Sequence, residues 1–278
     1  MKVNDQFQNK LIIICGASAG IGLETTRILF RMGANICLIA RNREPLQNAK
    51  DSLFKENHSE NQFIEIITCD STDMDRLKPL LEVFISNHGC PDYLINAVGF
   101  ALPHYIQDLT LQDFKNNMNV NYFGELIPTL IVLPHMIEKK GGHIAFISSM
   151  MGYFGIMGYA TYAPSKFAVT GLAEVLRHEL KPYHINISVL FPPDTNTPGF
   201  EKENQTKPEE CRMLSETIKP LEPQVVAQAF VKGILKRQFS ILPGGSKSTW
   251  RLFRFFPGFV HWFLDHDLAK ARKRLGKI

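Results

Sequence analysis

The chain of 278 residues is 45% hydrophobic and 21% charged, with a formal net charge of +4. This composition suits one large domain with a substantial core, argues against a disordered chain, and gives no reason to expect nucleic acid as a partner. The five cysteines are scattered and form no Cys-x-x-Cys pair, which argues against a disulfide framework or a metal site and favours a reducing compartment.

The N-terminal stretch 1–10 is polar and lacks the pattern of a signal peptide. No run of about 18 uncharged apolar residues occurs along the sequence. We therefore expect a cytoplasmic protein without a membrane span.

Short apolar runs and segments of helical periodicity alternate along the chain. The expected strands cover 11–15, 35–40, 63–68, 93–96, 144–148, 185–191 and 239–242. The expected helices cover 21–32, 46–55, 73–87, 111–139, 161–180 and 223–236, the fourth bent near Pro128 or Pro134. This alternation predicts an α/β fold: a single doubly wound Rossmann-type domain over residues 1–243, with a mostly parallel sheet of about seven strands and helices on both faces.

A glycine-rich turn follows the first expected strand. The spacing of Gly16, Gly20 and Gly22 lets the backbone approach a pyrophosphate, while the next helix offers its N–H groups and positive end. The simpler interpretation is a tight turn that needs glycine, but the first βα unit is where this fold places its phosphate site. We expect cofactor contacts from Gly16, Ser18, Gly20, Ile21 and Gly22.

The second expected strand ends in basic residues, Arg41 and Arg43, and offers no acid. A cofactor with a free 2′-hydroxyl usually meets an acid at this point, whereas an arginine can pair with a 2′-phosphate. Arg41 therefore predicts NADPH/NADP+ as the cofactor. The alternative is that both arginines are solvated residues at a helix start.

Polar residues also follow the third and fourth expected strands. Asp70 could accept a hydrogen bond from an adenine amino group, and Asn96 and Gly99 could border the adenine ribose. An ordinary Asx turn is nearly as good an interpretation.

Tyr162 and Lys166 lie one helical turn apart, so a phenol and an ammonium share one helix face. The ammonium would lower the phenol's pKa from about 10 and could hold a ribose hydroxyl. Ser149, after the fifth expected strand, could orient a substrate carbonyl oxygen toward the phenol. In isolation, Tyr162 would be interpreted as a half-buried aromatic of a helix.

Over about residues 8–243 the chain resembles the short-chain dehydrogenases/reductases. The resemblance rests on the Gly16–Gly22 turn, the element Asn96–Gly99, Asn121, Ser149, and the Tyr162–Lys166 pair. It implies a catalytic tetrad of Asn121, Ser149, Tyr162 and Lys166, with Asn121 supporting a water in the proton relay. It also implies pairing through long helices into a homodimer or homotetramer.

The chain departs from the family pattern at three positions. Cys15 stands in place of threonine behind the turn, Val98 in place of alanine, and Pro193 in place of glycine after the sixth strand. The first departure removes a hydroxyl contact.

The stretch 191–208 is similar to the 3-ketodihydrosphingosine reductase branch of that family. The similarity implies NADPH-dependent reduction of the 3-keto group of a long-chain keto-amine lipid in sphingolipid synthesis. It also implies that Thr197 contacts the nicotinamide and that 192–220 forms a lid over the lipid tail. The alternatives are reduction of another hydrophobic carbonyl (a steroid, retinal or acyl ketone), a catalytically silent NADP(H)-binding membrane scaffold, or, for the stretch itself, a proline-stiffened surface loop.

The C-terminal extension 244–278 is aromatic and basic. Seven Phe and Trp residues occur within 250–264, and five basic residues within 270–277. The segment is too short and too charged to span a bilayer, but it could lie at the cytoplasmic face of a membrane as a peripheral contact. Alternatively, the aromatics close the core or a subunit interface.

Overall fold

The computed structural model describes residues 6–56, 59–215 and 219–277. Within them, one sheet of parallel strands has the order β3-β2-β1-β4-β5-β6-β7. The strands are β1 (Leu11–Cys15), β2 (Asn35–Ala40), β3 (Ile64–Thr68), β4 (Tyr93–Asn96), β5 (Gly142–Ile147), β6 (Ile185–Leu190) and β7 (Ser240–Ile241). The order runs outward from β1 in both directions, which confirms the doubly wound Rossmann-type fold.

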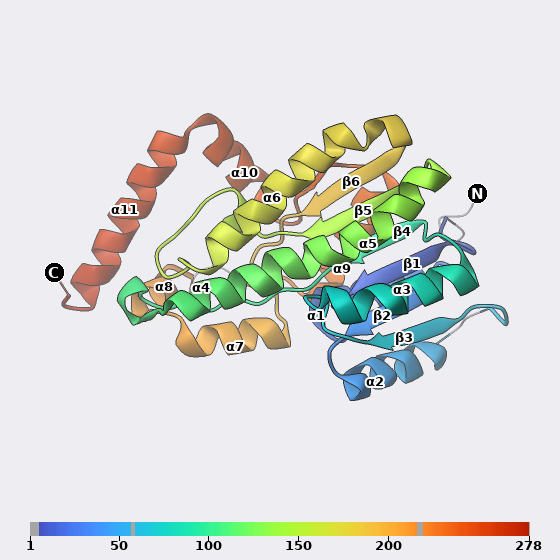
Figure 1. Ribbon diagram of the computed structural model, residues 1–278. Helices are drawn as coiled ribbons and strands as arrows, with labels where there is room; N and C mark the ends of the chain where they lie inside the picture. Colours follow the sequence, from blue (N-terminus) through green and yellow to red (C-terminus); the bar gives the residue numbers. More distant parts are fainter. Residues whose placement is uncertain (1–5, 57–58, 216–218, 278) are drawn as a thin grey trace.

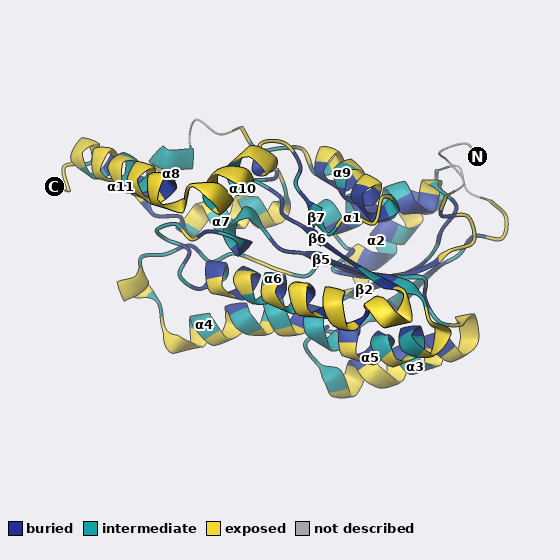
Figure 2. Cartoon of the chain, turned by 90° about the horizontal axis from the view of Figure 1, so that it is seen from above, coloured by how far each residue is buried: buried dark blue, intermediate teal, exposed yellow. Residues whose placement is uncertain are grey.

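Helices cover both faces of the sheet (Figures 1 and 2). The α-helices are α1 (Gly20–Arg31), α2 (Arg43–Phe54), α3 (Met74–His88), α4 (Leu111–Met118), α5 (Gly124–Lys139), α6 (Tyr162–Glu179), α7 (Pro198–Thr206), α8 (Glu209–Ser215), α9 (Pro223–Leu235), α10 (Ser246–Phe255) and α11 (Pro257–Arg274). Helices α3, α5 and α6 pack on one face, and α1, α2 and α9 pack on the other. Along β1, Ile13 faces the first layer and Ile14 the second, because neighbouring side chains of a strand point to opposite faces.

The long helical segment expected over 111–139 is present, but its irregularity differs from the predicted bend. A π-helical turn, η3 (Asn119–Phe123), joins α4 to α5 upstream of both Pro128 and Pro134, which lie inside α5. Such turns are rare and frequently occur at functional sites. The run Leu111–Lys139 is long and apolar enough to cross a membrane by length and composition, yet Ile131, Val132 and Met136 pack into the core of the sheet.

The segment after β6 lies beyond the carboxyl ends of the strands, as Figure 1 shows. It contains the short helices α7 and α8, whereas the sequence pattern predicted no helix here. Thr197 accepts a hydrogen bond from the Phe200 amide at 3.2 Å and so caps α7, while Pro198 is the first residue of that helix. Residues 216–218 of the expected lid lie outside the described residues.

The C-terminal extension forms a helical hairpin, α10 and α11. Phe253 of α10 stacks on Phe154 at a centroid distance of 4.2 Å, which anchors the hairpin to the segment after β5. The far end of α11 reaches α8, where Arg272 and Lys277 pair with Glu210 and Lys277 also pairs with Glu209. The last helix is therefore tied to the segment expected to form the lid.

Candidate active site

The glycine turn between β1 and α1 has the shape of a phosphate-binding turn. Gly16 and Gly20 have φ values of +83° and +57°, which favour glycine, and a Cβ at Gly22 would lie 2.3 Å from the Gly16 carbonyl oxygen. Helix α1 begins here without an acid in its first turn, so its N–H groups can receive a phosphate. The residues of the turn therefore fit a dinucleotide.

One cavity of about 1000 Å³ joins most of the expected cofactor residues. The following of them line it: Gly16, Ser18, Gly20, Ile21, Gly22, Arg41, Asp70, Gly99, Tyr162, Lys166 and Thr197. Most of these residues follow the ends of strands, whereas Tyr162 and Lys166 lie on α6, and the topology brings them together at the carboxyl ends of the strands.

Two polar residues lie at the end expected to hold the adenosine. Arg41 is exposed at the end of β2 and lines the cavity, whereas its neighbour Arg43 does not. Asp70 also lines the cavity, and one of its carboxylate oxygens accepts hydrogen bonds from the backbone and hydroxyl of Thr72, both at 2.9 Å. The Asx turn considered from sequence is therefore present beside the cavity.

Asn96 occupies a different position from the one expected. Its fully buried side chain donates to the Thr129 hydroxyl at 3.0 Å and does not line the cavity. The reason is the pleat: Asn96 and Leu94 are two residues apart on β4, so both point into the layer that contains α5. Asn96 thus connects the end of β4 to α5 and does not face the cofactor cavity.

Gly99 and Thr197 lie close to other site residues. A Cβ at Gly99 would lie 3.1 Å from the Lys166 Nζ and 3.2 Å from the Asn121 Oδ1, so this position requires a small residue. A Cβ at Gly20 would lie 3.1 Å from the Thr197 methyl group. The first residues of the expected lid therefore rest on the glycine turn.

Ser149 and Tyr162 meet in the cavity. Ser149 follows β5 and caps a short turn by accepting from the Met151 amide at 3.1 Å, while Tyr162 opens α6. The two side chains are close enough for Ser149 to lower the pKa of Tyr162. A carbonyl oxygen placed beside both hydroxyls would meet a donor for orientation and a donor for protonation.

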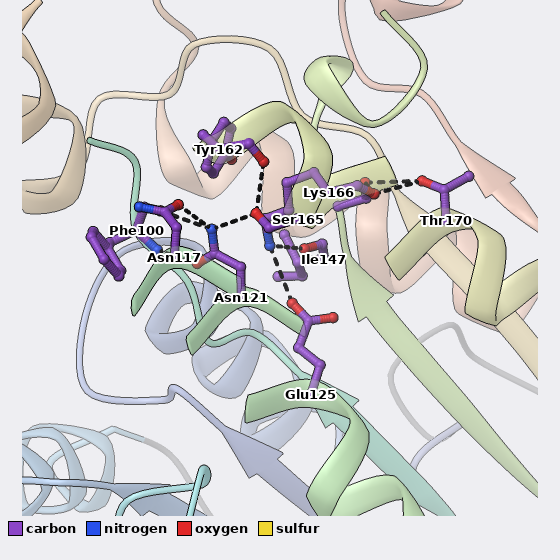
Figure 3. A network of polar contacts seen from close by, with 10 residues as sticks. Phe100, Asn117, Asn121, Glu125, Ile147, Tyr162, Ser165, Lys166 and Thr170 are labelled. Atoms are coloured by element: carbon purple, nitrogen blue, oxygen red, sulfur yellow. Dashed lines mark hydrogen bonds and ion pairs between the residues drawn. The ribbon is translucent and has the colours of Figure 1, made fainter. Parts of the chain in front are cut away.

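Lys166 and Asn121 are both buried, and Figure 3 shows the polar contacts that they make. The Lys166 ammonium donates to the Ile147 carbonyl at 2.7 Å and to the Glu125 carboxylate at 3.3 Å. Asn121, fully buried on η3, accepts from the Phe100 amide at 2.9 Å and lies within hydrogen-bond distance of three acceptors. It does not line the cavity.

The electrostatics of Tyr162 differ from the expectation. Burial raises the pKa of Tyr162 well above that of a free phenol, and the carboxylates of Glu203, Glu125 and Asp194 raise it further, while the hydrogen bond with Ser149 lowers it. The lowering expected from Lys166 is outweighed by burial and by these three carboxylates. The phenol is therefore held protonated at neutral pH.

The cavity contains a group of polar residues that the sequence pattern did not single out. We call Tyr159, Asp194, Glu203 and Lys207 the lid cluster; all four line the cavity. The Tyr159 hydroxyl donates to the Glu203 carboxylate, whose partner Lys207 lies at 3.6 Å. An acid directly after two prolines at the end of β6 is a sequence feature that could have singled out Asp194 as a site residue.

Glu125 was also missed. It is the single acid within the apolar run Gly124–Ile137, and it lies one helical turn after Asn121. This position offered a signal for a buried functional carboxylate.

Residues 10–208 match the family model described as short chain dehydrogenase. The chain belongs to the short-chain dehydrogenase family. It is therefore an oxidoreductase, and membership of the family implies a nicotinamide cofactor.

Curated relatives within the family match most of the chain. A 3-ketodihydrosphingosine reductase from Bos taurus is 38% identical over 230 residues, which cover 82% of this chain and 69% of the relative. A protein of the same name from Dictyostelium discoideum is 40% identical over 250 residues, covering 85% of this chain and 75% of the relative.

Solved structures of other proteins share the fold. Levodione reductase has a TM-score of 0.78 at 22% identity and covers 87% of this chain and 99% of its own. A 3-oxoacyl-[acyl-carrier protein] reductase from Brucella melitensis with bound NAD has a TM-score of 0.69 at 21% identity, covering 81% and 83%. At these identities the likeness concerns the architecture alone.

Proposed function

We propose that this dehydrogenase reduces the ketone of 3-ketodihydrosphingosine, or of a closely similar long-chain keto-amine, with NADPH. The reaction would serve sphingolipid synthesis. The observation that carries the proposal is the pair of carboxylates, Asp194 and Glu203, in the same cavity as the Tyr162 phenol. The names of the relatives from Bos taurus and Dictyostelium discoideum support the same substrate.

The lid cluster suits a substrate that carries a positive charge beside its ketone. Two carboxylates and the single ammonium of Lys207 leave the cluster with an excess negative charge. Burial raises the pKa of both Asp194 and Glu203, although Lys207 opposes the rise at each. A substrate ammonium would stabilise the charged carboxylates, whereas a steroid, retinal or simple acyl ketone offers no such group.

Apolar side chains at the outer end of the cavity would take the lipid tail. The cavity wall includes Met151, Phe154, Leu252, Phe253, Val260 and Phe263. They belong to the segment after β5 and to the hairpin of α10 and α11, so the tail would extend toward that hairpin.

The chemistry follows from the placement of the hydroxyls. The nicotinamide cofactor, when bound, supplies the hydride, and the residues of the glycine turn with Arg41 would hold it. Ser149 orients the carbonyl oxygen, and Tyr162 protonates that oxygen. The raised pKa of Tyr162 keeps the phenol protonated at neutral pH, so a proton is available for the carbonyl oxygen.

We also propose that α10 and α11 contact the cytoplasmic face of a membrane. Phe255, Phe256, Phe259 and Trp262 are each more than half exposed, and the basic residues Arg251 and Arg254 accompany them. Aromatic side chains suit the headgroup region, and basic ones suit anionic lipids. The hairpin also lines the cavity, so a lipid could pass between bilayer and site.

A homodimer through the outer face of α5 and α6 is a further part of the proposal. Phe123, Leu130, Phe167 and Val175 are large apolar side chains exposed on η3, α5 and α6. These four residues are the apolar surface that we propose a second copy covers.

The test compares 3-ketodihydrosphingosine with a 3-ketone of the same chain length that lacks the amino group, in an assay of NADPH oxidation. We expect Asp194→Asn and Glu203→Gln each to lower kcat/KM for the keto-amine by about tenfold, and to change that for the neutral ketone little, since each removes one charge-assisted contact. The matched control is Glu201→Gln, an exposed acid on α7 that does not line the cavity.

Tyr162→Phe separates catalysis from binding. We expect it to abolish reduction of both ketones while NADPH binding persists, because only the transferable proton is removed. Equal use of the two ketones by the unaltered enzyme would contradict the proposed substrate, and no turnover of any ketone would favour a binding scaffold.

A further inference from the structure

Glu125 is a buried carboxyl group at the base of the active site (Figure 3). It lies on the first turn of α5 and is fully buried, with its Oε1 atom 3.3 Å from the Lys166 Nζ. Its other oxygen, Oε2, is buried and has no hydrogen-bond partner among the described residues. A buried carboxyl group with one unsatisfied oxygen is costly, so its presence beside a site lysine calls for a role.

The side-chain amide of Asn121 is not available to hold the Lys166 ammonium. The Asn121 side chain lies one turn before Glu125, and its Nδ2 atom lies near the Phe100 carbonyl, the Asn117 Oδ1 and the Ser165 hydroxyl. Its oxygen accepts from the Phe100 amide. Asn121 therefore fixes the backbone around Gly99, while Glu125 is the charged partner that the Lys166 ammonium meets on this side.

The charge state of Glu125 changes within the neutral to mildly alkaline range. Burial raises the pKa of Glu125 to about 8, although Lys166 lowers it. Below about pH 8 the Glu125 carboxyl is neutral and does not offset the positive charge of Lys166. Above this pH the Glu125 carboxylate offsets that charge.

Other ionisable groups also surround the two residues. The Cys15 thiol of β1 faces Glu125, and its pKa is raised well above the ordinary value, first by burial and then by that carboxyl group. Tyr162 is influenced by Glu203, Glu125 and Asp194. Of these carboxylates, Glu125 is the one in contact with Lys166.

We propose that Glu125 is a positioning residue that holds the Lys166 ammonium at the base of the site and controls how much of its positive charge acts on Tyr162. The inference rests on the proposed role of Tyr162 as proton donor. With Glu125 neutral, the uncompensated ammonium makes the phenol a better acid; with Glu125 charged, the phenol donates its proton less readily.

The test is the pH dependence of single-turnover reduction. We expect the rate of the unaltered enzyme to fall by roughly threefold between about pH 6.5 and about pH 9, as a one-unit weakening of the acid predicts with a Brønsted slope near one half. In Glu125→Gln the ratio of the two rates should be near one. A merely structural role would lower both rates and leave the ratio unchanged, which would overturn the inference.

Two further measurements keep the test decisive. Glu125→Asp retains a titrating carboxyl group and should restore a fall in rate with rising pH. If the glutamine variant does not fold, infrared spectroscopy of the unaltered enzyme should show a protonated buried carboxyl band that disappears near pH 8 in step with the rate; a band unaffected across that range would overturn the inference.

The role of Glu125 and the identity of the substrate can be contradicted independently of each other. If 3-ketodihydrosphingosine is not reduced, the same rate ratio can be measured with any ketone that is. A substrate change leaves the prediction for Glu125 intact, because Glu125 acts on Tyr162 and not on the lipid.

Discussion

Arg41 is the residue that should decide between the two nicotinamide cofactors. It lines the cavity at the end of β2, where its guanidinium could pair with a 2′-phosphate. We expect Arg41→Ala to raise KM for NADPH by about tenfold, about 1.4 kcal/mol, and to change KM for NADH little. Because Arg43 is also exposed but lies outside the cavity, Arg43→Ala is the control; an unchanged preference in the Arg41 variant would rule out this role.

At the same scale, the protonation of Tyr162 shows what spacing alone could not predict. The four-residue interval to Lys166 correctly indicated a shared helix and a shared cavity. It could not indicate that Glu125, 41 residues before Lys166, would pair with the ammonium, because the contact between α5 and α6 depends on the tertiary fold. Asn96 is similar, since its side-chain direction depends on the pleat of β4.

Among the elements, the hairpin of α10 and α11 carries the prediction for membranes. Replacing both Phe255 and Trp262 with serine should reduce sedimentation with phosphatidylserine vesicles by about tenfold or more, because two large aromatic side chains no longer enter the lipid interface. Val83→Ser on α3 removes a similarly exposed apolar side chain and should have no effect. Vesicle binding that persists in the double variant would assign these aromatics to another surface.

In the long segment 111–139, the periodicity of apolar residues predicts a helix but not the irregular turn within it. Its helical character was predictable from the apolar repeat, whereas the π-helical turn at Asn119–Phe123 was not. The expected bends rested on Pro128 and Pro134, which α5 accommodates. The turn lies between Asn117 and Glu125, so it helps to aim both side chains and Asn121 at the site.

For the whole molecule, the apolar surface on α5 and α6 predicts a specific assembly. The unaltered enzyme should have at least twice the monomer mass by sedimentation equilibrium. Phe167→Glu should yield monomers at micromolar concentration, because association would bury a charge. Val83→Glu places the same charge on α3 and should leave the mass unchanged; a monomeric unaltered enzyme would contradict the assembly.

The overall architecture was the most predictable level. The strand positions and their alternation with helices were sufficient to predict the parallel sheet, because the connection between two parallel neighbouring strands is almost always right-handed. The helices within 192–220 and the hairpin at the C-terminus were less predictable, since both depend on contacts made across the cavity.

The tie between the last helix and α8 has a practical consequence for handling the protein. Lys277 pairs with Glu209 and Glu210 and donates to the Tyr105 hydroxyl, near the molecular surface. Such pairs weaken as ionic strength rises. Concentrated salt, the usual means of stripping peripheral proteins from bilayers, would therefore loosen α8 from α11 in the same step, and preparations should be returned to low salt before turnover is compared.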